Sequence, residues 1–258
     1  MKLQQIALQL YTLREHCKDR DALDETCRRV AEIGYRTVQV SGVNREAVPE
    51  AEIRAICEKH GLTICATHEA SDEIRHQPER VIERLRALGC TLTAFPFPNG
   101  VDFTDEAAIT SLIKDLDRSG KVLADAGIVL AYHNHHHEFR KLGGRPILER
   151  IYEETDARHL QGEPDTYWVQ YGGSDPVAWC RKLAGRLPII HLKDYRINTE
   201  SKPEYAEIGA GNLDMPAIIK AAEASGCTWF AVEQDSCPGD PFDSIAQSFR
   251  YLSTLVSD

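Results

Sequence analysis

The stretch GIVLAYHNHHHEF, residues 127–139, contains the pattern on which the predicted fold rests. Gly127 comes first, a short apolar run follows from Ile128 to Tyr132, and a dense group of polar side chains ends the stretch. A glycine in this place is typical of the left-handed cap that ends a helix just before a strand. The stretch therefore predicts, in order, a helix end, a buried strand and a polar site.

The same order recurs along the whole chain. Apolar or β-branched runs start at eight positions that are 31, 26, 29, 37, 30, 30 and 40 residues apart: Gln5, Arg36, Leu62, Thr91, Ile128, Arg158, Pro188 and Thr228. Hairpin connections are much shorter than these spacings, so helices are expected between the strands. Six glycines each precede a strand closely, as helix caps do: Gly34, Gly61, Gly89, Gly127, Gly185 and Gly226.

The segments between the runs have helical periodicity. Val81, Leu85 and Leu88 share one helical face, and Asp-x-Pro or Asp-Pro starts at Asp175 and Asp214 are typical of capped first turns. Eight strands alternating with helices predict a single (β/α)₈ TIM barrel spanning residues 1–258. A doubly wound open sheet is the alternative, but its phosphate-binding glycine motif does not follow the first strand.

Composition narrows the classes of partner. The chain has 258 residues, 30 Lys plus Arg and 40 Asp plus Glu, and a formal net charge of -10. This charge argues against nucleic acid and anionic membrane surfaces as partners. The N-terminus lacks the apolar core of a signal peptide, so we expect a cytoplasmic location. The eight cysteines form no C-x-x-C pair, so we expect free thiols, as in a reducing compartment.

Polar residues follow nearly every predicted strand, where a barrel places its active-site mouth. The mixture of imidazole and carboxylate groups from the fifth to the eighth strand is what a divalent transition metal needs. Four residues from four different strand–helix units form the predicted ligand set: Glu138, Asp165, His191 and Glu233.

Six segments spread over nearly the whole chain carry a resemblance to a known family: QLYTLR from Gln9, YHNHHHEF from Tyr132, EPDTYWVQYGGSDP from Glu163, IIHLKD from Ile189, EIGAGNLDMPAII from Glu207 and FAVEQD from Phe230. The chain resembles the xylose isomerase-like TIM barrel superfamily of sugar phosphate isomerases and epimerases. The resemblance implies one divalent ion (Mn, Zn, Co, Fe or Mg) at the barrel mouth, held by the four residues named above.

The fifth strand departs from the pattern of the ketose epimerases in that superfamily. Those enzymes carry the first glutamate ligand on the strand itself, whereas this chain has His133 and His135 there and Glu138 in the following loop. His133 is therefore an alternative to Glu138 as the first ligand. His133 and His135 are two residues apart, so a strand places both on one face, and either one is a candidate general base near neutral pH.

The remaining site predictions concern the reaction. Glu233 is the predicted base, and His133 or Glu138 would handle the proton on the other side. His135 is a further predicted catalytic residue. Four further residues are predicted to contact substrate, with Lys193 holding an oxygen or neutralising an enolate and Trp168 forming a wall: His68, Lys193, Trp168 and Gln39.

These features predict a divalent-metal-dependent isomerase or epimerase of a small sugar or keto-polyol, acting through an enediolate. A lyase of the inosose dehydratase or 3-keto-glycoside eliminase type is the alternative. A non-catalytic sugar-binding barrel ranks below both, and the net charge of -10 argues against the endonuclease branch of the superfamily. The expected partner is a small sugar or polyol; the sequence leaves homo-oligomerisation open.

Overall fold

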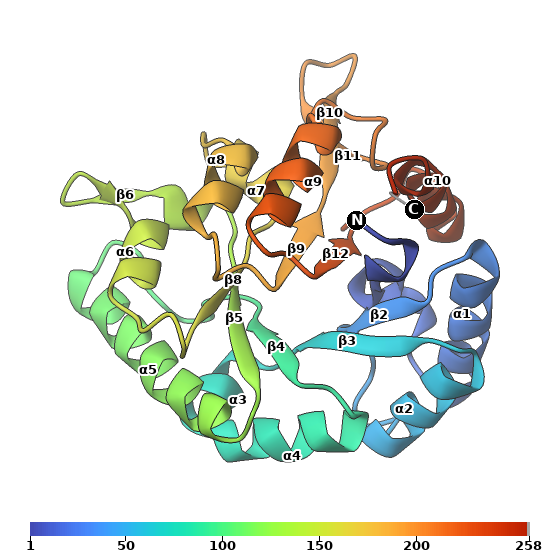
Figure 1. The fold of residues 1–258 in the computed structure, drawn as a ribbon, viewed down its shortest axis with the longest axis horizontal. Coiled ribbons are helices and arrows are strands. Elements are labelled where there is room, and N and C mark those ends of the chain that lie inside the picture. Colours follow the sequence, from blue (N-terminus) through green and yellow to red (C-terminus); the bar gives the residue numbers. More distant parts are fainter. Residues whose placement is uncertain (257–258) are drawn as a thin grey trace.

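The computed structural model describes residues 1–256, and its centre is one eight-stranded sheet of parallel pairs (Figure 1). All eight predicted strands are present, in the spatial order β8-β5-β4-β3-β2-β1-β12-β9. Their bounds are β1 (Ile6–Gln9), β2 (Thr37–Val40), β3 (Thr63–His68), β4 (Leu92–Phe95), β5 (Val129–His133), β8 (Gln161–Glu163), β9 (Ile189–Leu192) and β12 (Trp229–Val232).

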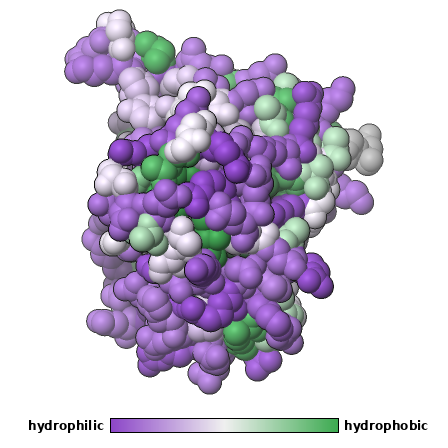
Figure 2. All heavy atoms as spheres, turned by 90° about the vertical axis from the view of Figure 1, so that its left-hand side faces the viewer, coloured by the Kyte–Doolittle hydropathy of each residue, from purple (hydrophilic) through white to green (hydrophobic). Residues whose placement is uncertain are grey.

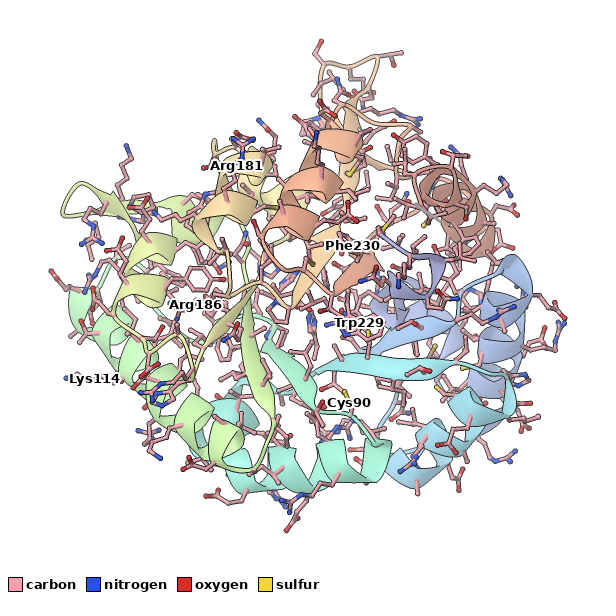
Figure 3. The ribbon with its side chains drawn as sticks, viewed as in Figure 1. Cys90, Lys114, Arg181, Arg186, Trp229 and Phe230 are labelled. Carbon is pink, nitrogen blue, oxygen red and sulfur yellow. The ribbon has the colours of Figure 1, made fainter. Side chains whose placement is uncertain are left out.

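The barrel closes between β8 and β9. Asp165, just beyond β8, forms an isolated parallel bridge with His191 of β9, and the His191 amide donates to the Pro164 carbonyl at 3.0 Å. At the other end of this seam, Arg186 donates to the carbonyls of Leu160 and Tyr152 at 2.5 and 2.6 Å (Figure 3). The seam matters for the site because it brings Asp165 and His191 together.

Helices surround the strands on the outside (Figure 1). The predicted helical faces and the capped starts at Asp175 and Asp214 are confirmed, and both aspartates accept a hydrogen bond from the first turn. The helices are α1 (Arg20–Ile33), α2 (Glu50–Lys59), α3 (Ser71–His76), α4 (Pro78–Leu88), α5 (Glu106–Asp125), α6 (Ile147–Glu153), α7 (Thr166–Tyr171), α8 (Pro176–Lys182), α9 (Met215–Ala224) and α10 (Pro241–Ser253).

Several short elements were not predicted. Two hairpins interrupt the alternation, β6 (Lys141–Leu142) with β7 (Arg145–Pro146) and β10 (Asp194–Ile197) with β11 (Pro203–Ala206). Three 3₁₀ helices lie at η1 (Leu3–Gln5), η2 (Leu10–His16) and η3 (His137–Phe139). The turn η3 decides the position of Glu138, as described below.

Strand alternation separates two apolar regions. In β1, Ile6 and Leu8 belong to the large cluster between strands and helices, whereas Ala7 belongs to a small cluster with Ala131 and Ala231. This small cluster also contains Leu92 and Ile189 and lies inside the barrel. After the three alanines, the next inward-facing residues along their strands are polar: Gln9, His133 and Glu233. The barrel thus has an apolar floor and a polar mouth.

The predicted helix-capping glycines all have positive φ: Gly34, Gly61, Gly89, Gly127, Gly185 and Gly226. Two features exclude a side chain at Gly34. Its φ of 126° is rarely adopted by residues with a side chain, and a Cβ atom would overlap the Phe249 ring. These residues end helices in the short connections that lead into the strands.

The eight cysteines are free, as predicted, and seven of them are buried. The face on the left of Figure 1 is largely hydrophilic, with small separate apolar patches (Figure 2). Within residues 1–256, no helix has the length and apolarity needed to cross a membrane.

Candidate metal centre

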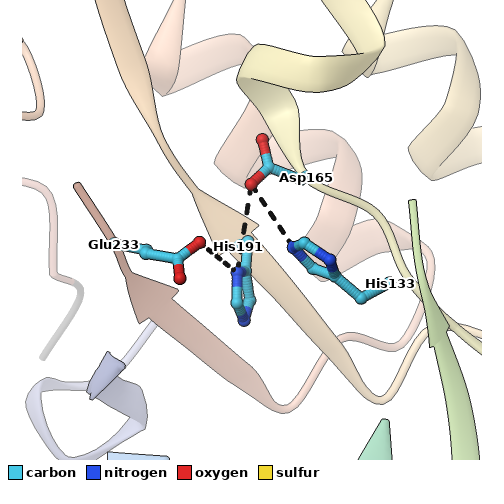
Figure 4. A group of neighbouring side chains, drawn as sticks. All are labelled: His133, Asp165, His191 and Glu233. Carbon is cyan, nitrogen blue, oxygen red and sulfur yellow. Dashed lines mark hydrogen bonds and ion pairs between the residues drawn. The ribbon is translucent and has the colours of Figure 1, made fainter. Parts of the chain in front are cut away.

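Four side chains converge at the polar mouth of the barrel: His133, Asp165, His191 and Glu233 (Figure 4). Each offers one ligand atom, and these atoms all lie within 4.8 Å of one another. His133 Nε2 lies 3.5 Å from Asp165 Oδ2, and His191 Nδ1 lies 3.0 Å from Glu233 Oε2. All four residues are buried.

The strand ends deliver these residues to one place. His133 ends β5, Asp165 follows β8, His191 lies in β9, and Glu233 directly follows β12. Ala231 is in register with His191, so Glu233 projects from the same face of its strand just beyond His191. The parallel order β5, β8, β9 and β12 thus brings residues up to 100 positions apart in the sequence to one end of the barrel.

The carboxylate of Asp165 is held by one oxygen and leaves the other for the cluster. Its Oδ1 accepts from the Trp168 amide at 3.0 Å, as the cap of α7. Its Oδ2 is buried and receives no well-aligned hydrogen bond, although Lys193 Nζ lies 3.1 Å away. A helix cap therefore aims an acceptor oxygen at the imidazoles.

A series of hydrogen bonds runs from Gln9 to His191 beneath the cluster. It determines which ring nitrogen of each histidine in the series carries the hydrogen. The Tyr11 amide donates to Gln9 Oε1 at 3.4 Å, so the amide nitrogen of Gln9 is the group that donates to His68 Nδ1 at 3.3 Å. His68 consequently carries its hydrogen on Nε2 and donates to Glu163 Oε2 at 2.5 Å.

The chain continues through Gln39 to His191. Because a carboxylate has no hydrogen to give, Gln39 Nε2 donates to Glu163 Oε1 at 2.7 Å. Gln39 Oε1 is then an acceptor for His191 Nε2–H at 2.8 Å. A neutral His191 therefore points the lone pair of Nδ1 at Glu233 Oε2.

His133 presents a second lone pair. Its Nδ1 lies 3.3 Å from the Pro96 carbonyl, which only accepts, so neutral His133 carries its hydrogen there. Its Nε2 is buried without a hydrogen-bond partner and faces Asp165 Oδ2. Two imidazole lone pairs and two carboxylates face one another, and this donor set fits a divalent transition-metal ion.

Two carboxylates, those of Glu163 and Glu233, act on the pKa of His191 when no ion is bound. Burial opposes ionisation, but Glu163 and Glu233 outweigh it and raise the pKa of His191 to about 10. A proton and a metal ion therefore compete for Nδ1, and metal binding is expected to release protons.

Lys193 adds a fixed positive charge beside the cluster. Its Nζ lies 2.7 Å from Glu233 Oε2 and 3.1 Å from both Asp165 Oδ2 and Asp235 Oδ1. Burial opposes its ionisation, yet these carboxylates raise the pKa of Lys193 well above its ordinary value. Despite burial, Lys193 and His191 lower the pKa of Glu233 well below its ordinary value, so Glu233 is ionised at neutral pH.

Glu138 is not part of this cluster, contrary to the predicted ligand set. The turn η3 directs its buried carboxylate back toward β5, where Oε1 accepts from the Tyr132 hydroxyl at 3.0 Å and Oε2 from the His135 amide at 2.9 Å. Burial raises the pKa of Glu138 to about 7. His133, the alternative noted from the sequence, takes the position beside Asp165, His191 and Glu233.

His135 faces the mouth of the barrel and lines the cavity there. Burial, then the neighbouring His133, lowers the pKa of His135 well below its ordinary value. The role of His135 as a base near neutral pH stays a prediction, and this shift in its pKa does not favour it. Its ring contacts that of His133, with centroids 4.9 Å apart, and that of Trp168 at 5.4 Å.

A cavity of about 410 Å³ opens above the cluster, a volume typical of small-molecule sites. It is lined by Tyr11, Arg14, Ser41, His68, Pro96, Phe97, His133, His135, Lys193, Glu233 and Asp235. Two predicted contact residues are not in this lining. Trp168 stands behind His135, and Gln39 is fully buried in the hydrogen-bond chain, where it acts on His191.

Glu163 is a functional residue that was not predicted from the sequence. The signal was available, because Glu163 is two residues before Asp165 and the alternation of an extended segment places both on one face. Its two acceptor oxygens connect His68 and Gln39, so Glu163 is a positioning residue for His191.

Replacing Glu163 with glutamine is expected to weaken binding of a divalent ion about 10- to 100-fold. This is the usual effect of losing a residue that orients a metal ligand through hydrogen bonds. The glutamine amide cannot accept from both His68 and Gln39, so the orientation of Gln39 and the tautomer of His191 are disturbed. Calorimetric titration of the metal-free protein with Mn²⁺ measures the change. Glu79→Gln on the exposed face of α4 is the control; equal affinities in both variants would contradict the role of Glu163.

The fold is a parallel (β/α)₈ barrel, and the imidazoles and carboxylates buried at its mouth could hold a metal ion. The sequence matches the family described as xylose isomerase-like TIM barrel over residues 27–255, and the chain belongs to that family.

Individual relatives are distant. The chain is 28% identical over 158 residues to an inosose dehydratase of Geobacillus thermodenitrificans, a match covering 55% of this chain and 52% of that protein. The chain thus spans about half the length of that relative. It is 22% identical to an inosose dehydratase of Geobacillus kaustophilus, covering 90% and 87% of the two chains. A sugar phosphate isomerase/epimerase from Parabacteroides distasonis has the same fold, with a TM-score of 0.83, 21% identity and coverage of 98% and 94%.

Proposed function

We propose that this protein is a divalent-metal-dependent enzyme that removes the proton next to the carbonyl of a small sugar or keto-polyol and thereby isomerises or epimerises it. One observation carries the proposal: two imidazole lone pairs and two carboxylates face one another beneath a cavity of about 410 Å³. His133, Asp165, His191 and Glu233 would hold the ion, which when bound supplies a Lewis acid that polarises the substrate carbonyl.

Glu233 is the proposed base. It lines the cavity, and its carboxylate is ionised at neutral pH, so it can accept a proton from carbon. Lys193 holds the Glu233 carboxylate in place and offsets negative charge that develops on the substrate. Asp235, which also lines the cavity, pairs with the same Lys193 ammonium.

The other side of the cavity differs chemically from the Glu233 side. It is lined by His68, His133, His135 and Phe97, and the carboxylates in the described lining are Glu233 and Asp235. Isomerisation needs one group that moves a proton between adjacent carbons, whereas epimerisation needs a second group on this imidazole side. Both ring nitrogens of His68 are engaged, by Gln9 and by Glu163, so water is the proposed proton donor on this side.

Elimination of water is the second candidate, and a specific observation favours it. The two sequence relatives described above are named inosose dehydratases, and the cavity lining includes imidazoles, a group type that can protonate a leaving hydroxyl. Proton removal by Glu233 is common to both candidates, so they differ only in the fate of the enolised substrate.

Incubation with keto-sugars and inososes in heavy water, with Mn²⁺ or Co²⁺ added and products followed by NMR, tests the proposal. We expect deuterium at the carbon next to the carbonyl and an isomeric product without loss of water. An unsaturated ketone with loss of water would establish the dehydratase instead. Absence of both exchange and product across the series, with metal content verified, would overturn both candidates. The Asp165→Asn variant is the control for metal-dependent turnover.

A further inference from the structure

A second group of nitrogen and oxygen ligands lies beside the first, formed by His135, His137 and Glu138. We infer that these three residues form a second divalent-cation site at the barrel mouth, for an ion that accepts imidazole nitrogen, with zinc as the representative. The group shares no ligand with His133, Asp165, His191 and Glu233. It therefore adds to the site already described and does not depend on the reaction proposed there.

Two imidazole nitrogens of the group lack hydrogen-bond partners. His135 Nδ1 and His137 Nε2 are both buried and make no hydrogen bond. His137 Nε2 lies 3.5 Å from Glu138 Oε1, and one ligand atom of each residue lies within 4.8 Å of the other two. Buried nitrogens without partners are costly, and a cation shared with the carboxylate satisfies both of them.

The group is rigidly held before any cation binds. The Tyr132 hydroxyl and the His135 amide fix the Glu138 carboxylate. The His135 and His137 rings are nearly parallel, with an angle of 7° and centroids 5.6 Å apart. The Phe97 ring packs edge-on against both of them, at 5.0 and 5.2 Å. Such support lowers the entropy cost of assembling ligands around an ion.

The donor set selects the class of cation. Two imidazole nitrogens and one carboxylate oxygen suit Zn²⁺, Co²⁺ or Fe²⁺ and do not suit Mg²⁺ or Ca²⁺, which prefer oxygen. Three protein ligands leave at least one position for water or a substrate oxygen. Because His135 lines the cavity, a ligand bound in that cavity lies next to this group as well as to the first.

Titration of the metal-free full-length protein with Zn²⁺, followed by calorimetry, tests the inference. The wild type is expected to bind two equivalents and His137→Gln one, because glutamine removes a ligand of the second group without touching the first. His136→Gln is the matched control, since the neighbouring His136 ring packs on Trp168 and Tyr171 and belongs to neither group. That control is expected to keep two equivalents.

A complementary variant removes the first group. His191→Ala is expected to lose one equivalent and retain the other, and anomalous diffraction from zinc-soaked crystals should place the retained ion between His135, His137 and Glu138. A wild type that binds one equivalent, unchanged by His137→Gln, would overturn the inference. Loss of all zinc in Glu138→Gln would also overturn it, since Glu138 would then serve a single shared site. None of these outcomes depends on turnover, so failure of the proposed reaction is distinguishable.

Discussion

Replacing Glu233 with glutamine is expected to lower kcat about 10²- to 10⁴-fold, the range associated with loss of a general base. The glutamine oxygen can still face the bound ion, and His133, Asp165 and His191 remain, so one metal equivalent should stay at the site. The amide cannot accept a proton from carbon, which separates the role as base from the role as ligand. Turnover of the substrate found by deuterium exchange, with metal content measured on the same sample, gives both quantities.

Asp235→Asn is the matched control for Glu233→Gln. Asp235 also lines the cavity and contacts Lys193, but it is not one of the grouped ligand residues. We expect a much smaller fall in kcat for Asp235→Asn. If Glu233→Gln stays within about tenfold of the wild type, a barrier change of about 1.4 kcal/mol, Glu233 is not the base.

The second large effect concerns the first ligand. His133→Ala is expected to weaken metal binding at the Asp165 and His191 site more than about 100-fold. This exceeds the effect of losing a residue that only hydrogen-bonds to a ligand. Glu138→Gln should leave that site intact, because Glu138 contacts Tyr132 and the His135 amide. Anomalous diffraction from Mn²⁺-soaked crystals of each variant reports the occupancy of this site separately from any neighbouring one.

The opposite pattern of manganese density in the two variants would contradict His133 as the ligand. Manganese density between Asp165, His191 and Glu233 that disappears in Glu138→Gln and persists in His133→Ala would place Glu138 in the ligand set after all. Circular dichroism of both variants provides the check on folding, since Glu138 is fully buried and His133 nearly so.

The strand pattern was predictable because it depends on short-range chemistry. The run from Gln5 to Tyr11 was expected as the first strand, and β1 covers Ile6–Gln9. The difference arises because Leu10–His16 winds into a 3₁₀ segment, with the Gln9 side chain accepting from the Tyr11 amide. The β10–β11 hairpin was missed because much of it is exposed, so burial leaves no strong apolar alternation in its sequence.

The sequence by itself determined the barrel and three members of the candidate metal site. Asp165, His191 and Glu233 sit on or directly after strands, and parallel pairing brings such positions to one edge whatever the loops do. Their convergence followed from the spacing of apolar runs and from side-chain alternation, which are local properties of the chain.

Only the tertiary structure decided between His133 and Glu138, and only it revealed the hydrogen-bond chain through Gln39 and Glu163. Glu138 follows its strand by five residues, and the direction of a side chain in such a turn depends on backbone angles and on packing against Tyr132. This series of hydrogen bonds connects residues of β1, β2, β3, β8 and β9, which meet only when the barrel closes. The tautomer of His191 is therefore a property of the closed barrel, since residues far apart in sequence must all be in place before its lone pair has a defined direction.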